Sequence, residues 1–185
     1  MAWIDVIDES GASGELEEAY RSITGARGKL SNIMRVHSLH PGAMLAHMEL
    51  YRQLLFSRSG LSRAERELIG VVVSARNACS YCVRHHAEAL RAYWKDADRV
   101  QMAIDNYDAA GLTDRQRAML DYAVRLTDDP SAVSEGHVEQ LRETGLSDRD
   151  ILDVNLIASY FNFVNRIAEG LGVTFTDDEA TGFRY

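Results

Sequence analysis

The amino-acid sequence predicts an all-α protein. Proline, which interrupts regular elements, occurs only twice in 185 residues, whereas alanine, leucine, glutamate and arginine, which favour helix, are frequent. No stretch longer than four or five residues alternates apolar and polar residues as a half-buried strand does. The short candidates 71–73 and 173–175 lie inside a helical period and in the C-terminal tail. We therefore expect a multi-helix bundle.

Capping residues mark where several of these helices begin. Ser62 and Glu65 form a capping box, in which each side chain accepts a hydrogen bond from the other residue's backbone N–H. Thr113, Ser134 and Ser147 are N-caps of the same kind. The expected helices span residues 14–24, 30–37, 42–57, 62–76, 79–94, 96–107, 113–127, 134–144 and 147–169.

Glycine favours the left-handed turn that ends a helix, and five glycines stand where these helices should stop. They are Gly25, Gly60, Gly111, Gly145 and Gly170. The length of the chain predicts a single domain over residues 1–185. The segments 1–12 and 172–185 are expected to be arms, which lie either across a neighbouring subunit or on their own domain. Their aromatic residues are Trp3, Phe175, Phe183 and Tyr185.

Composition and charge exclude several classes of protein. Hydrophobic residues make up 46% of the chain and charged residues 26%, which is typical of a globular protein with a sizeable core. The net charge of -8 and the lack of a basic cluster argue against a nucleic-acid partner. No apolar stretch is long enough to span a membrane, and the acidic N-terminus is unlike a secretory signal. We expect a cytoplasmic protein, in which thiols are kept reduced.

The only two cysteines of the chain form the motif Cys79-x-x-Cys82. His86 follows the second cysteine by four residues, and Glu67 precedes the first by twelve. Two thiols this close on one helical turn can form and break a disulfide, and the imidazole and carboxylate can move the protons that this chemistry requires. A reduced cytoplasmic Cys-x-x-Cys is more often redox-active or metal-binding than structural.

Helical spacing places these side chains on one face. Cys79 and Cys82 are one turn apart, and His86 is an i, i+4 neighbour of Cys82. His85 is displaced from this line but is an i, i+3 neighbour of Cys82. Glu67 belongs to the preceding helix and faces the stripe if the two helices pack side by side. A carboxylate buried there needs a hydrogen-bond partner.

These residues predict a peroxidase cycle. Glu67 accepts or relays a proton from His86, and His86 helps to deprotonate Cys82. The Cys82 thiolate attacks the O–O bond of a peroxide and becomes a sulfenic acid. Cys79 condenses with it to a disulfide, which an external dithiol reduces. Because Cys79 lies at the expected helix start, where unpaired N–H groups stabilise a thiolate, the residues alone leave open which sulfur attacks.

A zinc site is the main competing interpretation. Cys79, Cys82 and His86 are good zinc ligands, with His85 or Glu67 as a fourth. A structural site usually draws its second ligand pair from elsewhere in the chain, and no second cysteine pair exists. The alternative outside enzymes is therefore a non-catalytic redox sensor or a zinc-stabilised binding module.

The pattern Glu67-x11-Cys79-x2-Cys82-x3-His86 resembles the signature of the AhpD-like alkylhydroperoxidases, within the carboxymuconolactone decarboxylase superfamily. Residues 32–41 resemble the segment before that motif, and residues 160–172 are similar to the closing helix of the peroxidase-related subgroup. The resemblance implies an AhpD-like all-α bundle that forms a homo-oligomer, a trimer or a hexamer. It also implies reduction of hydrogen peroxide or organic hydroperoxides, with electrons from an external dithiol or disulfide reductase.

The resemblance further implies roles for individual residues. Cys82 attacks the peroxide, Cys79 resolves the sulfenic acid, and Glu67 and His86 form the proton relay, with no metal or organic cofactor. One position departs from the family pattern, because Tyr81 stands where a histidine is found inside the motif. A phenol with a pKa of about 10 is a poorer proton shuttle at neutral pH, and His85 is the candidate that compensates. A lactone decarboxylase of the wider superfamily is the second enzymatic alternative, although its chemistry does not call for a dithiol.

Overall fold

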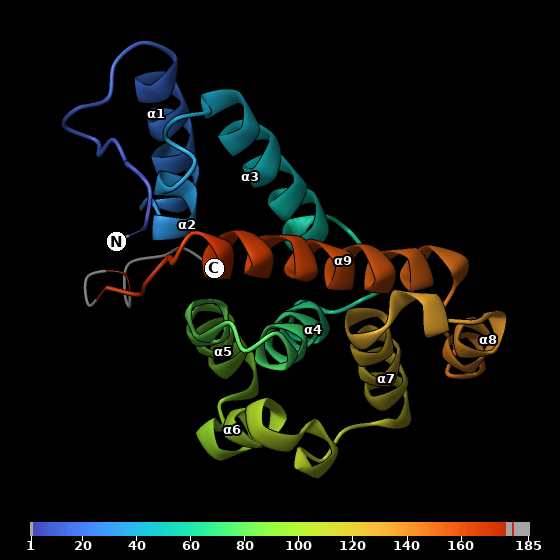
Figure 1. Cartoon of the computed structure of the whole chain (residues 1–185). Coiled ribbons are helices and arrows are strands. Elements are labelled where there is room, and N and C mark those ends of the chain that lie inside the picture. Colours follow the sequence, from blue (N-terminus) through green and yellow to red (C-terminus); the bar gives the residue numbers. More distant parts are fainter. Residues whose placement is uncertain (1, 177–178, 180–185) are drawn as a thin grey trace. The chain divides into compact units, whose positions relative to one another are not determined.

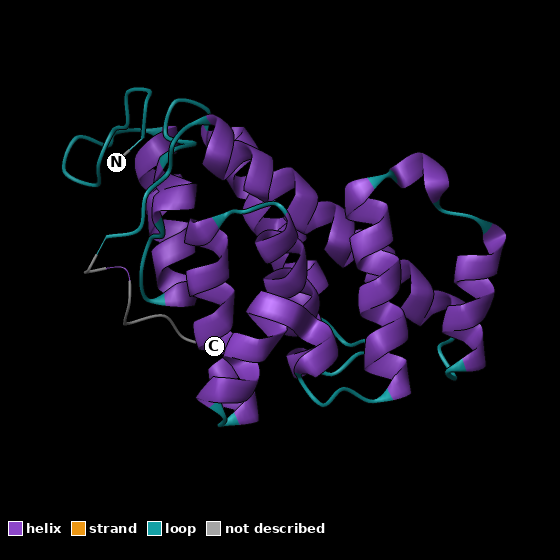
Figure 2. Ribbon diagram, turned by 60° about the horizontal axis from the view of Figure 1, so that its bottom comes forward, coloured by secondary structure: helices purple, strands orange, loops and turns teal. Residues whose placement is uncertain are grey.

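The structure is a computed structural model, and it describes residues 2–176 and residue 179. Within these residues every regular element is helical and no strand is present, so the all-α prediction is confirmed (Figure 2). The elements are α1 (Glu15–Arg27), α2 (Asn32–Arg35), α3 (Pro41–Phe56), α4 (Arg63–Arg76), α5 (Ser80–Trp94), α6 (Ala97–Asn106), η1 (Tyr107–Ala109), α7 (Asp114–Asp128), η2 (Pro130–Ala132), α8 (Glu135–Glu143) and α9 (Asp148–Gly170).

The helix starts follow the predicted caps. Ser62 and Thr113 each form a complete capping box, with Glu65 and Gln116. Three of the five predicted glycine turns were wrong. Gly60 and Gly170 lack the left-handed φ that Gly111 and Gly145 adopt, and Gly170 lies within α9. Gly25 does not end α1, which continues to Arg27. The left-handed turn occurs instead at Gly28, with a φ of 77°. Gly25 keeps a helical backbone because a second glycine follows three residues later and takes the conformation that terminates the helix.

The residues group into two compact units. One comprises residues 1–53 and 166–185, and the other comprises residues 54–165. The chain passes from one unit to the other within α3 and again within α9. The single-domain organisation over residues 1–185 stays a prediction.

In the first unit, the described parts of both terminal segments bind to their own chain. The backbone N–H of Trp3 donates to the carbonyl oxygen of Leu171 at 2.8 Å. The Asn32 side chain donates to the carbonyl oxygen of Thr174 at 3.1 Å, and the Tyr20 hydroxyl donates to the carbonyl oxygen of Ile7. The aromatic residues Phe183 and Tyr185 lie outside the described residues.

The second unit is built around α4. This helix is buried without interruption from Glu65 to Ser74, which is typical of a helix surrounded by others rather than one packed on a single side. Its contacts are most extensive with α5, followed by α7 and α6. Figure 1 shows α4 and α5 side by side, with α9 passing across them. The buried polar side chains of α4 therefore need partners on these neighbours.

Across the part of the chain that the structure describes, no helix is both long and apolar enough to cross a membrane.

A pair of histidines in the first unit, buried His47 and half-buried His37, makes the stability pH-dependent. His47 Nδ1 lies 3.3 Å from His37 Nε2, and His37 Nδ1 lies 2.8 Å from the carbonyl oxygen of Ile33. Burial, and then the neighbouring His37, lower the pKa of His47 from 6.5 to about 4. The unfolded chain therefore binds more protons than the folded one below pH 6.5, and this difference destabilises the folded state increasingly as the pH falls to about 4.

We expect the free energy of unfolding to decrease by roughly 2 kcal/mol between about pH 7.5 and about pH 5 from His47 alone. Urea unfolding at both pH values measures this change. His47→Gln should reduce the pH dependence by that amount, because glutamine does not titrate. Substitution of the half-exposed His137 on α8 is the control and should leave the contribution of His47 unchanged. An unaltered pH dependence in His47→Gln would contradict the assignment.

Candidate active site

The first part of the candidate site is a buried carboxylate on α4. The Glu67 side chain is fully buried, at 0% exposure. Its Oε2 lies 2.7 Å from Nδ1 of His86 on α5, so the structure brings together these two sequence-predicted residues. A carboxylate can only accept hydrogen bonds, so Nδ1 carries the proton. In the neutral imidazole, Nε2 is then the nitrogen that can accept a proton.

Arg63 binds the other oxygen of the same carboxylate. Its Nε donates to Glu67 Oε1 at 2.9 Å, and its Nη2 donates to that oxygen as well. Nη1 donates to the carbonyl oxygen of Leu55 at 2.9 Å, and the guanidinium lies over the Phe56 ring, 3.6 Å from its centre. The arginine side chain is only 14% exposed. Glu67 is thus held between a guanidinium and an imidazole.

These contacts decide the ionisation of Glu67. Burial by itself would raise the pKa of the carboxyl group, but the positive charge and hydrogen bond of His86, followed by those of Arg63, outweigh it. The pKa of Glu67 is therefore below its usual value. Glu67 is a carboxylate anion at neutral pH, even though no part of its side chain reaches water.

The two cysteines occupy the first turn of α5. Cys79 is the N-cap residue, as the predicted helix start indicated, and Cys82 lies within the first turn. Both are buried, with exposures of 0% and 3%, and no disulfide joins them. Residues three apart in a helix have Cβ atoms about 5–6 Å apart, somewhat more than the roughly 4 Å of a disulfide. Because Cys79 has non-helical dihedral angles, its side chain can approach Cys82 without breaking the helix.

The turn before Cys79 is held by hydrogen bonds from two helices. Ala78 has a φ of 55°, in the left-handed region that residues other than glycine rarely adopt. The Cys79 N–H donates to the carbonyl oxygen of Ser74 at 2.9 Å. The Asn77 side chain donates to Oδ1 of both Asn162 and Asn165 on α9, at 3.0 and 2.9 Å. These amides, which the sequence left without a role, fix the turn that places Cys79.

Phe161 from α9 supports the imidazole. Its ring meets the His86 ring edge to face, with centres 4.5 Å apart. The phenyl group also packs against the backbone of α4 at Gly70, where an added Cβ would lie 2.4 Å from Phe161 Cζ. Glycine at this position is therefore required for the close approach of α9 to the site.

We expect Gly70→Ala to displace Phe161 and loosen His86. Overpacking of this kind costs about 1–3 kcal/mol, measurable as a lower free energy of unfolding, and the reactivity of Cys82 towards iodoacetamide should fall with it. Gly25→Ala is the matched control, because Gly25 is also helical and a Cβ there meets no atom within 4 Å. That change should stabilise the protein by about 0.5–1 kcal/mol. Equal effects of the two substitutions would contradict the packing argument.

The two supporting candidates lie together beside the cysteines. Tyr81 is buried, at 4% exposure, and its ring is tilted against that of His85 with centres 4.8 Å apart. The supporting role of Tyr81 and His85 stays a prediction, which is based on their positions near Cys82 in the sequence.

The geometry does not favour the zinc interpretation. Among the residues that the structure describes, which include all five candidate ligands, no three His, Cys, Asp or Glu side chains are arranged to hold a metal ion. Instead, Glu67 Oε2 and His86 Nδ1 are hydrogen-bonded to each other.

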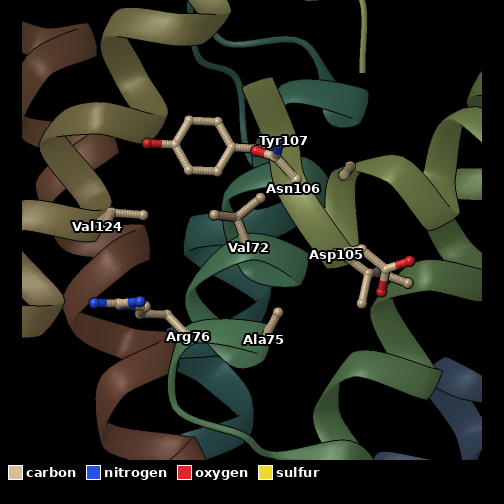
Figure 3. A pocket seen from close by; sticks show the side chains of 9 residues that line it. Val72, Ala75, Arg76, Asp105, Asn106, Tyr107 and Val124 are labelled. Carbon is tan, nitrogen blue, oxygen red and sulfur yellow. The ribbon is translucent and has the colours of Figure 1, made fainter. Parts of the chain in front are cut away.

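A pocket of about 310 Å³ lies on the other side of α4. Val72, Ala75 and Arg76 line it from this helix, and Tyr107 and Val124 line it from η1 and α7 (Figure 3). Glu67 and the cysteines are not among its lining residues. In a helix, Val72 and Arg76 point away from the face that carries Glu67 and Gly70. This pocket is therefore separate from the thiol site.

Comparison with known proteins agrees with this fold. Residues 41–125 match the carboxymuconolactone decarboxylase family. The crystal structure of an AhpD-core, peroxidase-related protein of uncharacterised function from Ralstonia eutropha JMP134 is 30% identical. It has a TM-score of 0.87, with 97% of this chain and 94% of that chain covered. The chain belongs to the AhpD-like proteins of the carboxymuconolactone decarboxylase family.

Two further relatives show how far the likeness extends. The alkyl hydroperoxide reductase AhpD of Gluconacetobacter diazotrophicus is 34% identical over 88 residues, which are 47% of this chain and 47% of that protein. The chain therefore matches about half the length of this curated relative. The debrominase Bmp8 has the same fold, with 18% identity, a TM-score of 0.76 and coverage of 95% and 96% of the two chains.

Sequence reasoning anticipated the contact of Glu67 with His86 and missed other residues that support it. Arg63 precedes Glu67 by four residues on one helix, so the i, i+4 spacing of opposite charges was a signal that could have identified it. Phe161 and Asn77 had no such signal, because their partners lie more than 70 residues away in the sequence.

Proposed function

We propose that this protein is a thiol peroxidase that reduces hydrogen peroxide or organic hydroperoxides through a dithiol–disulfide cycle of Cys79 and Cys82. The observation that carries the proposal is a buried cysteine pair on the same helix as His86, whose Nδ1 is hydrogen-bonded to the buried carboxylate of Glu67. This combination supplies a nucleophilic sulfur, a resolving sulfur and an oriented base. The likeness to a peroxidase-related protein and to an alkyl hydroperoxide reductase supports the same activity.

The first half of the cycle oxidises Cys82. His86 Nε2 accepts the proton of the Cys82 thiol, and the thiolate attacks the terminal oxygen of the hydroperoxide. An S–O bond forms as the O–O bond breaks, which gives a sulfenic acid and an alkoxide or hydroxide. The proton held by His86 neutralises this leaving group, so an alcohol or water departs.

The second half of the cycle restores the thiols. The Cys79 thiol attacks the sulfenic sulfur of Cys82, and water leaves as the disulfide forms. An external dithiol, free or carried by a disulfide reductase, then exchanges with this disulfide and is itself oxidised. The N-cap position of Cys79 supports its role as the resolving residue, since this residue can move without unwinding α5.

A peroxide-consumption assay with several dithiol donors tests the proposal. We expect catalytic consumption of hydrogen peroxide or an organic hydroperoxide, with one dithiol oxidised for each peroxide reduced. Prior treatment with iodoacetamide should abolish it. Metal analysis of the same preparation is the control for the competing interpretation. No turnover with any donor, or stoichiometric zinc that resists mild chelation, would contradict the peroxidase function.

A further inference from the structure

The contacts of Glu67 give Arg63 a part in the chemistry that the motif does not include. Glu67 receives Nδ1–H of His86 on Oε2 and two N–H groups of Arg63 on Oε1. The two oxygens thus have different partners, an imidazole on Oε2 and a guanidinium on Oε1. A guanidinium stays protonated in proteins, whereas an imidazole gains and loses its proton near neutrality.

We propose that Arg63 keeps Glu67 ionised throughout the cycle, so that the proton taken from Cys82 stays on His86 and is never passed to Glu67. The carboxylate is then a fixed anion that orients the imidazole and stabilises the imidazolium. This inference rests on the proposed function. It replaces the sequence-based expectation that Glu67 accepts or relays the proton.

The geometry around Arg63 supports a fixed position. Its side chain is mostly buried, donates to the carbonyl oxygen of Leu55 and lies over the Phe56 ring, so its nitrogens are held in place. A planar guanidinium can satisfy the carboxylate and a carbonyl at once, which the single ammonium of lysine does less well. Arg63 is therefore a positioning residue, which acts on the reacting sulfur through Glu67 and His86.

The other charged side chains near this end of α4 are bound to partners other than Glu67. On α7, Arg115 pairs with Glu65, with Nε and Oε1 3.0 Å apart. Arg66 donates to the carbonyl oxygens of Leu61 and Ser57. From α9, the ring of Phe161 packs on His86 and carries no charge. Of the charged groups, His86 and Arg63 act most strongly on Glu67.

Removal of Arg63 should let burial dominate whenever His86 is neutral, because the charge of His86 is the other influence that opposes desolvation of Glu67. Desolvation is the largest single influence on the Glu67 carboxyl group, and it favours the neutral acid. In Arg63→Met, which keeps the length and apolar stem but not the charge, Glu67 should become protonated in part near neutral pH. A protonated carboxyl group competes as a donor and no longer holds Nδ1–H, so His86 becomes a weaker base for Cys82.

Two measurements that use no peroxide test this inference. The first is infrared spectroscopy of the carboxylic-acid carbonyl band, assigned by its loss in Glu67→Gln. Wild type should show no such band for Glu67 between about pH 5 and about pH 9, including the range in which the Cys82 thiolate forms, whereas Arg63→Met should show it. A band that appears in wild type as the thiolate forms would overturn the proposal, because it would show the relay to Glu67.

The second measurement is the rate of Cys82 alkylation by iodoacetamide against pH, in a Cys79→Ser background. We expect Arg63→Met to slow alkylation by about tenfold or more near neutral pH and to add a second ionisation to the profile. Arg63→Lys keeps the charge and should preserve the wild-type profile with a smaller loss of rate. A purely structural role would lower the rate equally at every pH, and an unchanged profile shape in Arg63→Met overturns the inference.

Arg76→Met is the matched control. Arg76 lies on the same helix and forms an exposed ion pair with Asp128 on α7, so its loss should change neither the band nor the profile. If Arg63→Met does not fold, the wild-type infrared measurement and Arg63→Lys still decide the question. Failure of the peroxide assay with these results intact would refute the peroxidase function and leave the role of Arg63 standing.

Discussion

Substitution of either cysteine should abolish catalytic peroxide consumption. Cys82→Ser removes the attacking sulfur, and a serine hydroxyl is too weak an acid to replace a thiolate. Cys79→Ser leaves the attacking sulfur but removes the partner for the disulfide, so the enzyme stops at the sulfenic acid. Multiple-turnover assays with an external dithiol should show no rate above the uncatalysed reaction for either variant.

A single-turnover experiment separates the two roles. Cys79→Ser should consume about one equivalent of peroxide and form a sulfenic acid that dimedone traps, whereas Cys82→Ser should do neither. A buried serine hydroxyl without a partner costs about 1–3 kcal/mol, so Cys82→Ala, which buries no polar group, is the folding control. Dimedone labelling of Cys79 in a Cys82 variant would reverse the assignment of the attacking and resolving sulfurs.

His86→Ala and Glu67→Gln should each lower the peroxidase rate by roughly 10²-fold or more, the usual scale for the loss of a general base. His86→Ala removes the group that accepts the thiol proton. Glu67→Gln leaves the imidazole but replaces the anion that holds Nδ1–H with a neutral amide. Because that amide also leaves Arg63 buried opposite a neutral group, we expect Glu67→Gln to lower the free energy of unfolding by about 3–5 kcal/mol.

Raising the pH distinguishes a lost base from a distorted site. Hydroxide can remove the thiol proton in His86→Ala, so its rate should recover towards wild type as the pH increases, whereas a displaced sulfur would stay slow at every pH. The stability of Glu67→Gln is measured by urea unfolding, and its rate is compared below the unfolding transition. Substitution of His137, which is half-exposed on α8 and outside the candidate site, should leave the rate unchanged. Wild-type rates in both site variants would remove the proton transfer from the mechanism.

The local signals in the sequence predicted most of the helices because capping and glycine turns are short-range effects. Ser62 and Thr113 begin α4 and α7 as predicted, since the residues that satisfy their backbone groups are three positions away. The predicted end of α1 at Gly25 was wrong because the signal used for it is also short-range. Two glycines three residues apart offer the same left-handed turn, and local preference does not choose between Gly25 and Gly28.

The candidate site was predicted where its contacts follow helical spacing. Cys79, Cys82 and His86 lie near the start of one helix, so helical spacing predicted their order and their shared face from the sequence. The pairing of Glu67 with His86 depends on the packing of α4 against α5. The sequence predicted this pairing only on the assumption that the two helices pack side by side. The tertiary structure adds two contributions from α9: Phe161 against His86, and the asparagines that hold the turn before Cys79.

The sequence by itself determined the helices and the order of the thiols and imidazole along α5, because both depend on residues a few positions apart. Only the tertiary structure decided the ionisation state of the Glu67 carboxyl group. Its side chain is out of water, where burial favours the neutral acid, and a guanidinium and an imidazole from two helices make it an anion instead. The balance between desolvation and charge pairing depends on which groups meet in three dimensions, and spacing along the chain specifies only one of them, Arg63.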